Sequence, residues 1–213
     1  MENNITKAKM EELLVSRNTP QVYEKVKVSR VGIAGLGGLG SHVAIALART
    51  GVGHLHLVDF DVVEPSNLNR QEYRMRHLGL YKTEALKSQI EEINPYVTVT
   101  INTQKITKDN AMDIFQDDDI VCEAFDLPEQ KAMLVNTLLE NRSDIKIVSG
   151  SGMAGYASNN IIKTRKVMKN LYLCGDEMNG LKPGWGLMAP RVSICAGHEA
   201  NTVLRLILGE EGV

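Results

Sequence analysis

The sequence contains few cysteines, and their arrangement excludes two classes of structural site. The three cysteines, Cys122, Cys174 and Cys195, stand far apart and form no Cys-x-x-Cys pair. Their number excludes a zinc site made of four cysteines, so we expect no structural zinc. An odd number of cysteines in a chain of 213 residues also argues against a disulfide framework and indicates a reducing, cytoplasmic location.

Long apolar runs and an excess of positive charge are also absent. No stretch of about 18 apolar residues occurs, so we expect no membrane-spanning helix. The first residues, MENNITKAKMEELLVSR, lack the apolar centre of a signal peptide. Lysine and arginine total 24 against 26 aspartates and glutamates, a formal net charge of −2. This balance argues against nucleic acid as a partner, because such binders need a general attraction to phosphates.

Apolar periodicity predicts alternating strands and helices over roughly the first 150 residues. Strands are expected at 28–34, 54–58, 97–101, 120–124 and 145–148. Helices are expected at 38–49, 109–115 and 128–141, and another ends at Asn94-Pro95 with Leu86, Ile90 and Ile93 on one face. This alternation is typical of an α/β, Rossmann-like fold with a mostly parallel sheet and helices on both faces.

The two ends of the chain differ from this core. Met10, Leu13 and Leu14 form an apolar stripe on a short N-terminal helix within residues 1–20. After residue 150 we expect a short antiparallel part with strands at 161–162, 171–173 and 192–195, a loop at 180–190 and a closing helix at 196–208. The chain is expected to form one domain over 1–213, with its α/β core at 28–150 and a C-terminal part at 151–213.

A glycine-rich turn joins the first core strand to its helix. Residues 35–40, Gly-Leu-Gly-Gly-Leu-Gly, fit the pattern G-x-G-x-x-G. Such a turn lets the backbone approach a phosphate and directs free N–H groups of a helix N-terminus at it. Asp59 follows at the end of the next strand, where a carboxylate can accept hydrogen bonds from ribose hydroxyls. The sequence therefore predicts a nucleotide-binding core.

The glycine motif alone does not choose between NAD, FAD and ATP. Short-chain dehydrogenases carry a Tyr-x-x-x-Lys pair after the cofactor loop. The only such spacing here, Tyr23 to Lys27, precedes the first core strand, and Tyr156 is followed at the fourth place by Asn160. This difference argues against an NAD-dependent oxidoreductase without excluding it. A non-catalytic nucleotide-binding module also stays open.

The segment after the second core strand is more specific. Residues 59–71 read DFDVVEPSNLNRQ, and together with residues 35–41 they resemble the ThiF/MoeB/HesA family. The resemblance extends from about Arg17 to Leu208. Members of this family are adenylyltransferases of ubiquitin-like sulfur carriers. The resemblance implies that a carrier with a diglycine C-terminus attacks the α-phosphate of ATP, giving an acyl-adenylate and pyrophosphate.

This reaction requires no general base, because an α-carboxylate with a pKa of about 3.5 is already ionised at neutral pH. It requires neutralisation of the polyphosphate and in-line positioning of the reactants. The resemblance further implies Mg²⁺ and a homodimer. The compact, zinc-free sequence is most similar to the ThiF branch, which suggests thiamine biosynthesis and a ThiS-like carrier. Action on a molybdopterin carrier or on a tRNA base stays open.

The resemblance also assigns roles to individual residues. Asp59 would bind the ribose, and Asn67 and Arg70 would bind the phosphates. Lys82 would neutralise the β/γ end of the triphosphate. The full set of nucleotide-binding positions implied in this way is Gly35, Gly37, Gly38, Leu39, Gly40, Asp59, Asp61, Asn67, Arg70 and Lys82.

Two further residues complete the catalytic set that the resemblance implies. Asp126 corresponds to the family's magnesium-binding aspartate, although the local sequence Glu-Ala-Phe-Asp departs from the usual Asp-x-x-Asp. Its alternative role is the N-cap of the helix at 128–141. Arg17 corresponds to an N-terminal arginine that reaches the ATP of the neighbouring subunit in a dimer, and its alternative is an ordinary surface arginine.

The C-terminal part contains two residues whose roles stay open. Cys174 lies where thiamine-synthesis relatives carry a loop cysteine. No Lys, Arg or His lies within three positions to lower its pKa, so we favour a buried apolar role. Cys122 and Cys195 lie in expected strands and are predicted to be core residues. Trp185, the only tryptophan, either lines a channel for the carrier's tail or caps the sheet.

Overall fold

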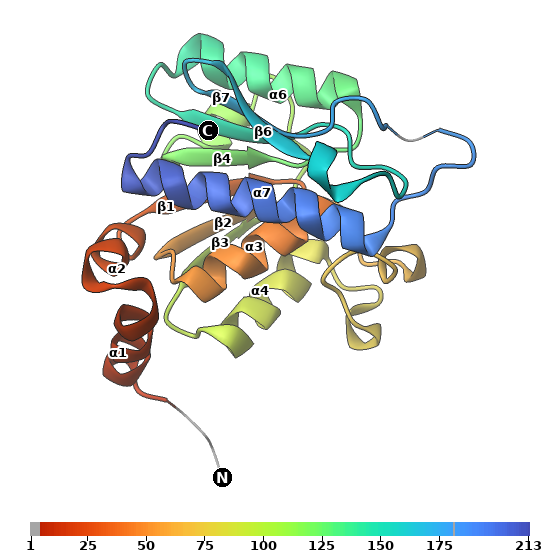
Figure 1. Ribbon diagram of the computed structural model, residues 1–213. Coiled ribbons are helices and arrows are strands. Elements are labelled where there is room, and N and C mark those ends of the chain that lie inside the picture. The colour runs from red at the N-terminus through yellow and green to blue at the C-terminus, as the bar shows by residue number, and fades with distance from the viewer. Residues whose placement is uncertain (1–4, 181) are drawn as a thin grey trace.

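The computed structural model describes residues 5–180 and 182–213 and contains a sheet of seven strands (Figure 1). The strands are β1 (Arg30–Ala34), β2 (His54–Val58), β3 (Thr98–Asn102), β4 (Ile120–Glu123), β5 (Lys146–Gly150), β6 (Lys163–Met168) and β7 (Leu171–Gly175). Their order across the sheet is β3-β2-β1-β4-β5-β7-β6. Neighbours pair in parallel except β6 and β7, which pair antiparallel. The expected mostly parallel sheet with an antiparallel C-terminal part is confirmed.

Helices cover both faces of this sheet, as the alternation of elements predicts. They are α1 (Lys7–Asn18), α2 (Pro20–Val26), α3 (Gly38–Thr50), α4 (Lys82–Ile93), α5 (Ala111–Ile114), α6 (Pro128–Asn141) and α7 (Ala189–Leu208). One apolar core lies between the sheet and α3, α4 and α7, and the second lies between the sheet and α5 and α6. In both β1 and β2 the last four residues are buried, as expected of parallel strands covered on both faces.

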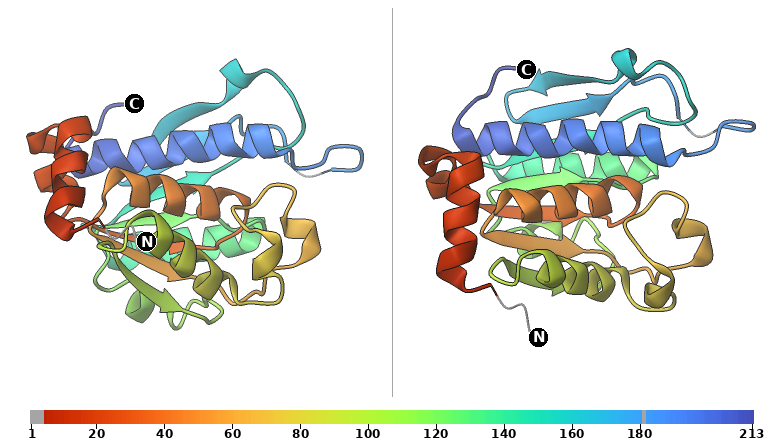
Figure 2. Two further views of the ribbon diagram at one scale, coloured as in Figure 1. Left: turned by 90° about the horizontal axis from the view of Figure 1, so that it is seen from below. Right: turned by 60° about the horizontal axis from the view of Figure 1, so that its bottom comes forward.

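The strand order reverses direction at β1. β2 pairs with one side of β1, and β4 pairs with the other. In an open parallel sheet the loops that leave two such strands diverge, and a crevice opens at their carboxyl ends. Figure 1 and Figure 2 show α1 and α2 at one end of the molecule and the loops at 59–81, 176–180 and 182–188 at the other.

The expected strand at 192–195 is wrong, because these residues belong to α7. The apolar run from Val192 to Cys195 is too short to show whether its apolar residues repeat with the period of a strand or of a helix. Over the whole helix, Val192, Cys195, Ala196 and Val203 fall on one buried face, which packs against α3 and the sheet. The helix therefore begins seven residues earlier than the expected 196, at Ala189. Within the described residues, no helix is long and apolar enough to cross a bilayer.

Two smaller differences lie outside the α/β core. The structure contains a helix that the sequence reading missed, α2, with Pro20 in its first turn. Thr19, which separates α1 from α2, has a φ of 71°, so the expected end of the N-terminal helix at Asn18-Thr19-Pro20 is confirmed. The strand expected at 161–162 is wrong, because the 3₁₀ turn η3 (Asn159–Ile161) precedes β6 there.

Substitution of Gly40 tests how closely α3 packs against the glycine turn. A Cβ at Gly40 would overlap the carbonyl oxygen of Gly35, whereas a Cβ at Gly197 on α7 would meet nothing within 4 Å. We expect Gly40→Ala to lower the free energy of unfolding by about 1–3 kcal/mol. Gly197→Ala is the matched control and should raise it by up to about 1 kcal/mol, since alanine is the better helix former. Urea unfolding measures both, and equal effects would contradict the packing described.

Candidate functional site

A cavity of about 730 Å³ lies at the carboxyl ends of β1, β2, β4 and β5. Most of the sequence-predicted positions meet there, although they come from separate segments of the chain. Those that line it are Gly35, Gly37, Gly38, Leu39, Asp59, Asp61, Asn67, Arg70, Lys82 and Asp126. Gly40 and Arg17 do not line it, and the contact of Gly40 is with the backbone of Gly35.

The glycine turn presents the uncapped N-terminus of α3 to this cavity. Gly35 has a φ of +88°, a conformation that side-chain-bearing residues rarely adopt. Gly37 occupies the N-cap position, and no side chain in the described part of the chain accepts from the first N–H groups of α3. Because those groups carry partial positive charge, the helix end can bind an anion such as phosphate.

Asp59 ties the glycine turn to the segment that follows β2. Its carboxylate accepts hydrogen bonds from the backbone N–H of Leu36 at 2.6 Å and of Asp61 at 2.8 Å. Burial raises the pKa of the Asp59 carboxyl, and the nearby Lys82 ammonium opposes part of that rise. This residue therefore fixes two backbone segments in addition to lining the cavity.

The segment from 61 to 82 forms a closed loop whose two ends lie together. The Lys82 ammonium contacts the Asp61 carboxylate at 2.8 Å, and the Lys82 N–H donates to the Asp61 carbonyl at 3.0 Å. Lys82 is only 6% exposed, at the start of α4. Asn67 accepts from the N–H of Glu64 at 3.0 Å and so stabilises the turn η1 (Pro65–Asn67) within this loop.

Two buried polar atoms of this loop have no hydrogen-bond partner among the residues described. They are Nε of Arg70 and Oε1 of Gln71, and both side chains line the cavity. Arg70 is otherwise held by the Ser66 carbonyl at 3.2 Å and the Asn69 side chain at 2.8 Å. Buried polar atoms are almost always paired, so the described residues leave these two atoms of the cavity wall unsatisfied. Gln71 was not among the sequence-predicted residues, although it ends the NLNRQ run.

Asp126 lies in the exposed connection between β4 and α6. Leu127 occupies the N-cap position of α6, so Asp126 is not the cap of that helix. Asp126 and Asp61 both line the cavity. Within residues 5–180 and 182–213, no three His, Cys, Asp or Glu side chains gather in a group that could hold a metal ion alone.

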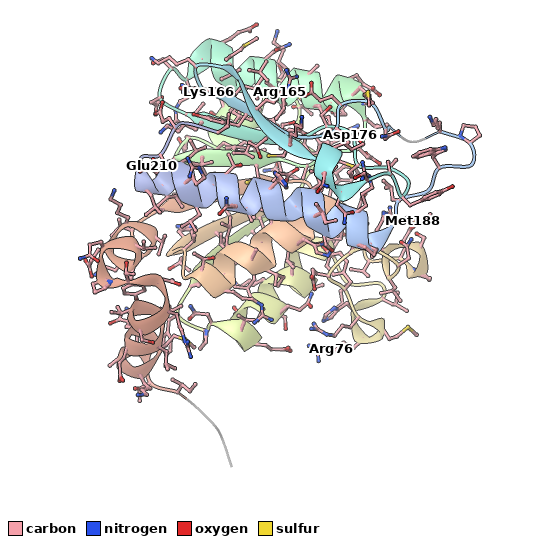
Figure 3. The ribbon with its side chains drawn as sticks, viewed as in Figure 1. Arg76, Arg165, Lys166, Asp176, Met188 and Glu210 are labelled. Atoms are coloured by element: carbon pink, nitrogen blue, oxygen red, sulfur yellow. The ribbon has the colours of Figure 1, made fainter. Side chains whose placement is uncertain are left out.

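The outer wall of the cavity comes from two loops of the C-terminal part. Met153 and Ala154 line it from the first loop, and Asn179 and Leu187 from the second. A buried ion pair between Asp176 and Arg191 ties the second loop to the first turn of α7. Figure 3 shows Asp176 and Met188 at the end of the molecule where the second loop projects, away from Glu210. The sequence predicted a loop at 180–190 but did not assign Met153, Ala154, Asn179 or Leu187 to the site.

Trp185 belongs to the second loop but does not line the cavity. Its ring stacks on Tyr156 with the centroids 5.7 Å apart, and a Cβ at Gly155 would overlap it. The ammonium of Lys182 lies 4.6 Å from its centroid. Trp185 therefore holds the two outer loops together, and its two expected roles, in a channel for the carrier's tail or as a cap on the sheet, stay predictions.

The cysteines are buried, as the sequence predicts. Cys174 is fully covered, and burial raises the pKa of its thiol to about 12. A thiol with such a pKa carries almost no nucleophilic thiolate at neutral pH. Cys122 lies on β4, whereas Cys195 lies on α7 instead of a strand. All three are core residues.

Arg17 lies on α1, at the opposite end of the sheet from the cavity. Its neighbour Asn18 donates to the carbonyl of Thr50 at 2.7 Å, which anchors α1 beside the end of α3 that precedes β2. Figure 2 shows α1 at the end of the molecule away from the loops at 59–81. Arg17 can therefore reach a nucleotide only on another subunit, and its role stays a prediction.

A buried acid lies directly behind the floor of the cavity. Glu199 of α7 is fully buried, and within the described chain neither of its carboxyl oxygens has a hydrogen-bond partner. A Cβ at Gly150, which lines the cavity, would overlap its Oε1. Burial raises the pKa of Glu199 to about 8, against the attraction of the Lys131 ammonium. At neutral pH this carboxyl is therefore mostly protonated.

Comparison with known proteins agrees with this geometry. The model of the ThiF family matches residues 10–213. The chain belongs to the ThiF family. It is 28% identical over 194 residues to adenylyltransferase and sulfurtransferase UBA4 of Candida glabrata, covering 87% of this chain and 44% of that relative. It is 34% identical over 136 residues to tRNA threonylcarbamoyladenosine dehydratase of Haemophilus influenzae, covering 63% of this chain and 52% of the relative. The match thus spans about half of these relatives.

A solved member of the same fold is similar over its whole length. The E. coli tRNA N6-threonylcarbamoyladenosine dehydratase TcdA, in complex with ATP, superposes with a TM-score of 0.86 at 22% identity. The superposition covers 98% of this chain and 100% of that one. At this identity the likeness establishes the fold, and it confirms the Rossmann-like architecture that the ThiF-family resemblance implies.

Glu199 makes stability depend on pH in a direction opposite to that of most carboxylates. Its pKa rises from 4.5 to about 8 on folding, so between these values the unfolded chain binds fewer protons. The free energy of unfolding therefore falls as pH increases through this window, by at most about 1.4 kcal/mol per pH unit from this group. We expect the free energy of unfolding of Glu199→Gln, measured with urea, to decrease less steeply with pH than that of the wild type between about pH 5 and pH 8. The exposed control Glu140→Gln should keep the wild-type slope; identical slopes in all three proteins would contradict the assignment.

Proposed function

We propose that this protein is an ATP-dependent adenylyltransferase that activates the C-terminal glycine carboxylate of a ubiquitin-like sulfur carrier. The observation that carries the proposal is the convergence of the predicted nucleotide residues on one cavity. There they surround an uncapped helix N-terminus, and the buried Nε of Arg70 and Oε1 of Gln71 lack partners within the described residues. Membership of the ThiF family supports it independently.

The proposed reaction joins two anions. A carboxylate oxygen of the carrier forms a bond to the α-phosphorus, and the bond between the α-phosphorus and the bridging oxygen to the β-phosphorus breaks. Pyrophosphate leaves, and the acyl-adenylate remains. The carboxylate is already ionised, so positioning and charge neutralisation dominate. Arg70 and Lys82 would neutralise the pyrophosphate, and Asp59 would hold the ribose.

Mg²⁺ fits this arrangement. Asp61 and Asp126 line the cavity, and proteins commonly hold Mg²⁺ through one or two carboxylates together with substrate phosphates. Bound there, the ion would supply further neutralisation of phosphate charge. Lys82 and the Asp61 carboxylate are already paired, so Asp126 is the carboxylate left for the ion. We further propose a homodimer in which Arg17 reaches the partner's nucleotide.

The carrier and the pathway are the finer part of the proposal. The absence of Cys-x-x-Cys pairs from the sequence favours a ThiS-like carrier of thiamine biosynthesis. Action on tRNA is the second candidate, because a tRNA threonylcarbamoyladenosine dehydratase superposes on the whole chain. The net charge of −2 favours the protein carrier.

Nucleotide binding is tested by thermal unfolding with Mg-ATP and with NAD. Mg-ATP at a hundred times its dissociation constant should stabilise the protein by about 2.7 kcal/mol, and NAD should not. Arg70→Ala should lose this stabilisation. Arg76→Ala is the matched control, because Arg76 lies on the same loop (Figure 3) but does not line the cavity and pairs with Glu92 at 2.6 Å. Stabilisation by NAD alone would overturn the proposal.

The substrate is tested by ATP–pyrophosphate exchange. A ThiS-like carrier ending in Gly-Gly should stimulate the exchange, and the same carrier with a C-terminal amide should not, since it lacks the attacking carboxylate. Lys82→Met should lower the exchange rate about a hundredfold, the typical effect of losing one charge clamp. Exchange that depends on tRNA and ignores the carrier would select the second candidate.

A further inference from the structure

Two lysines of the cavity, Lys105 and Lys131, have no role in the function proposed above. Lys131 lies in the first turns of α6 and lines the cavity. Arg70 and Lys82 approach from the segment after β2, whereas α6 follows β4, on the opposite side of β1. The glycine turn therefore has a cation on each side.

The Lys131 ammonium is fixed by a buried carboxylate. It donates to Oε1 of Glu123 at 3.1 Å and to Oε2 at 3.0 Å. Glu123, the last residue of β4, is itself fully buried and also accepts from the Phe125 N–H at 2.7 Å and from the Ser149 hydroxyl. An ammonium has three N–H groups, and the described residues accept from it only through Glu123. The Lys131 side chain is 22% exposed, so a ligand in the cavity can reach it.

The segment that carries Lys131 adjoins the glycine turn. A Cβ at Gly35 would lie 3.0 Å from the Phe125 ring and 3.1 Å from the Ala124 carbonyl. In this fold class the nucleotide phosphates lie at the N-terminus of the helix after the glycine turn. With the ribose at Asp59 and the pyrophosphate at Arg70 and Lys82, the α-phosphate is the group closest to β4.

We propose that Lys131 binds the α-phosphate of the nucleotide, on the side from which the acyl carboxylate arrives. The inference rests on the proposed binding of ATP in this cavity. The remaining wall, at Gly150 to Ala154, lies beyond β4, so a carboxylate that enters along it meets the α-phosphate beside Lys131. Two anions repel each other at this point, and a fixed ammonium offsets that repulsion without reorganisation.

The competing role for Lys131 is neutralisation of Glu123. An unpaired carboxylate at this position would repel the phosphates, so the loss of Lys131 alone would weaken binding under either role. Removal of both charges separates the two roles. If Lys131 only cancels Glu123, nucleotide affinity returns in the variant K131M/E123Q. If Lys131 binds phosphate, affinity stays low. The double variant also avoids the buried unpaired charge that could unfold K131M alone.

The test is the affinity of the full chain for AMP, ATP and adenosine, measured by isothermal titration calorimetry. AMP carries only the α-phosphate. K131M/E123Q should bind AMP and ATP more weakly by the same factor, about tenfold or more, with adenosine unchanged. The variant K131R conserves the positive charge and should retain most of the wild-type affinity for AMP. R70A is the matched comparison and should weaken ATP binding much more than AMP binding.

Each other result overturns the inference. Wild-type AMP affinity in K131M/E123Q would mean that Lys131 only neutralises Glu123. Weaker binding of ATP with unchanged binding of AMP would mean that Lys131 contacts the β- or γ-phosphate instead of the α-phosphate. A wild-type protein that binds neither AMP nor ATP would overturn the proposed function as well, so the two failures are distinguishable. Circular dichroism and thermal unfolding without nucleotide confirm that each variant is folded.

Discussion

The reversal of strand order at β1 is the constraint on which the rest of the structure depends. β2 and β4 pair with opposite sides of β1. Because the crossovers between parallel strands are right-handed, α3 and α4 cover one face of the sheet while α5 and α6 cover the other. The loops after β1, β2 and β4 consequently separate, and the cavity forms between them.

Two buried carboxylates then organise this cavity in different ways. Asp59 accepts from two backbone N–H groups and so fixes the path of the glycine turn relative to the loop after β2. Glu123 holds an ammonium and so fixes the position of a charge. Burial makes both arrangements rigid, since an unpaired carboxylate in either place would be costly. Glu199 does not incur the cost of a buried unpaired charge, because its carboxyl stays mostly protonated.

The sequence predicted the α/β core well and the C-terminal part less well. β2 and α6 have the expected bounds, because each is a self-contained periodic segment flanked by turn or cap residues. The residues at 192–195 were misread because four apolar residues fit a strand and a helix equally. The helix is favoured because it packs against α3. α3 and α7 are more than a hundred residues apart in the sequence, so no local pattern predicts this contact.

The sequence by itself determined the glycine turn, the carboxylate at the end of β2 and the family, because these depend on the spacing of neighbouring residues. Most of the residues that it predicted for the site line the cavity. Only the tertiary structure decided that Lys131 pairs with Glu123, that Glu199 lies behind Gly150, and that α1, the helix of Arg17, lies at the far end of the sheet. These relations depend on the order of the strands and on burial, which bring together side chains that no local pattern in the chain connects.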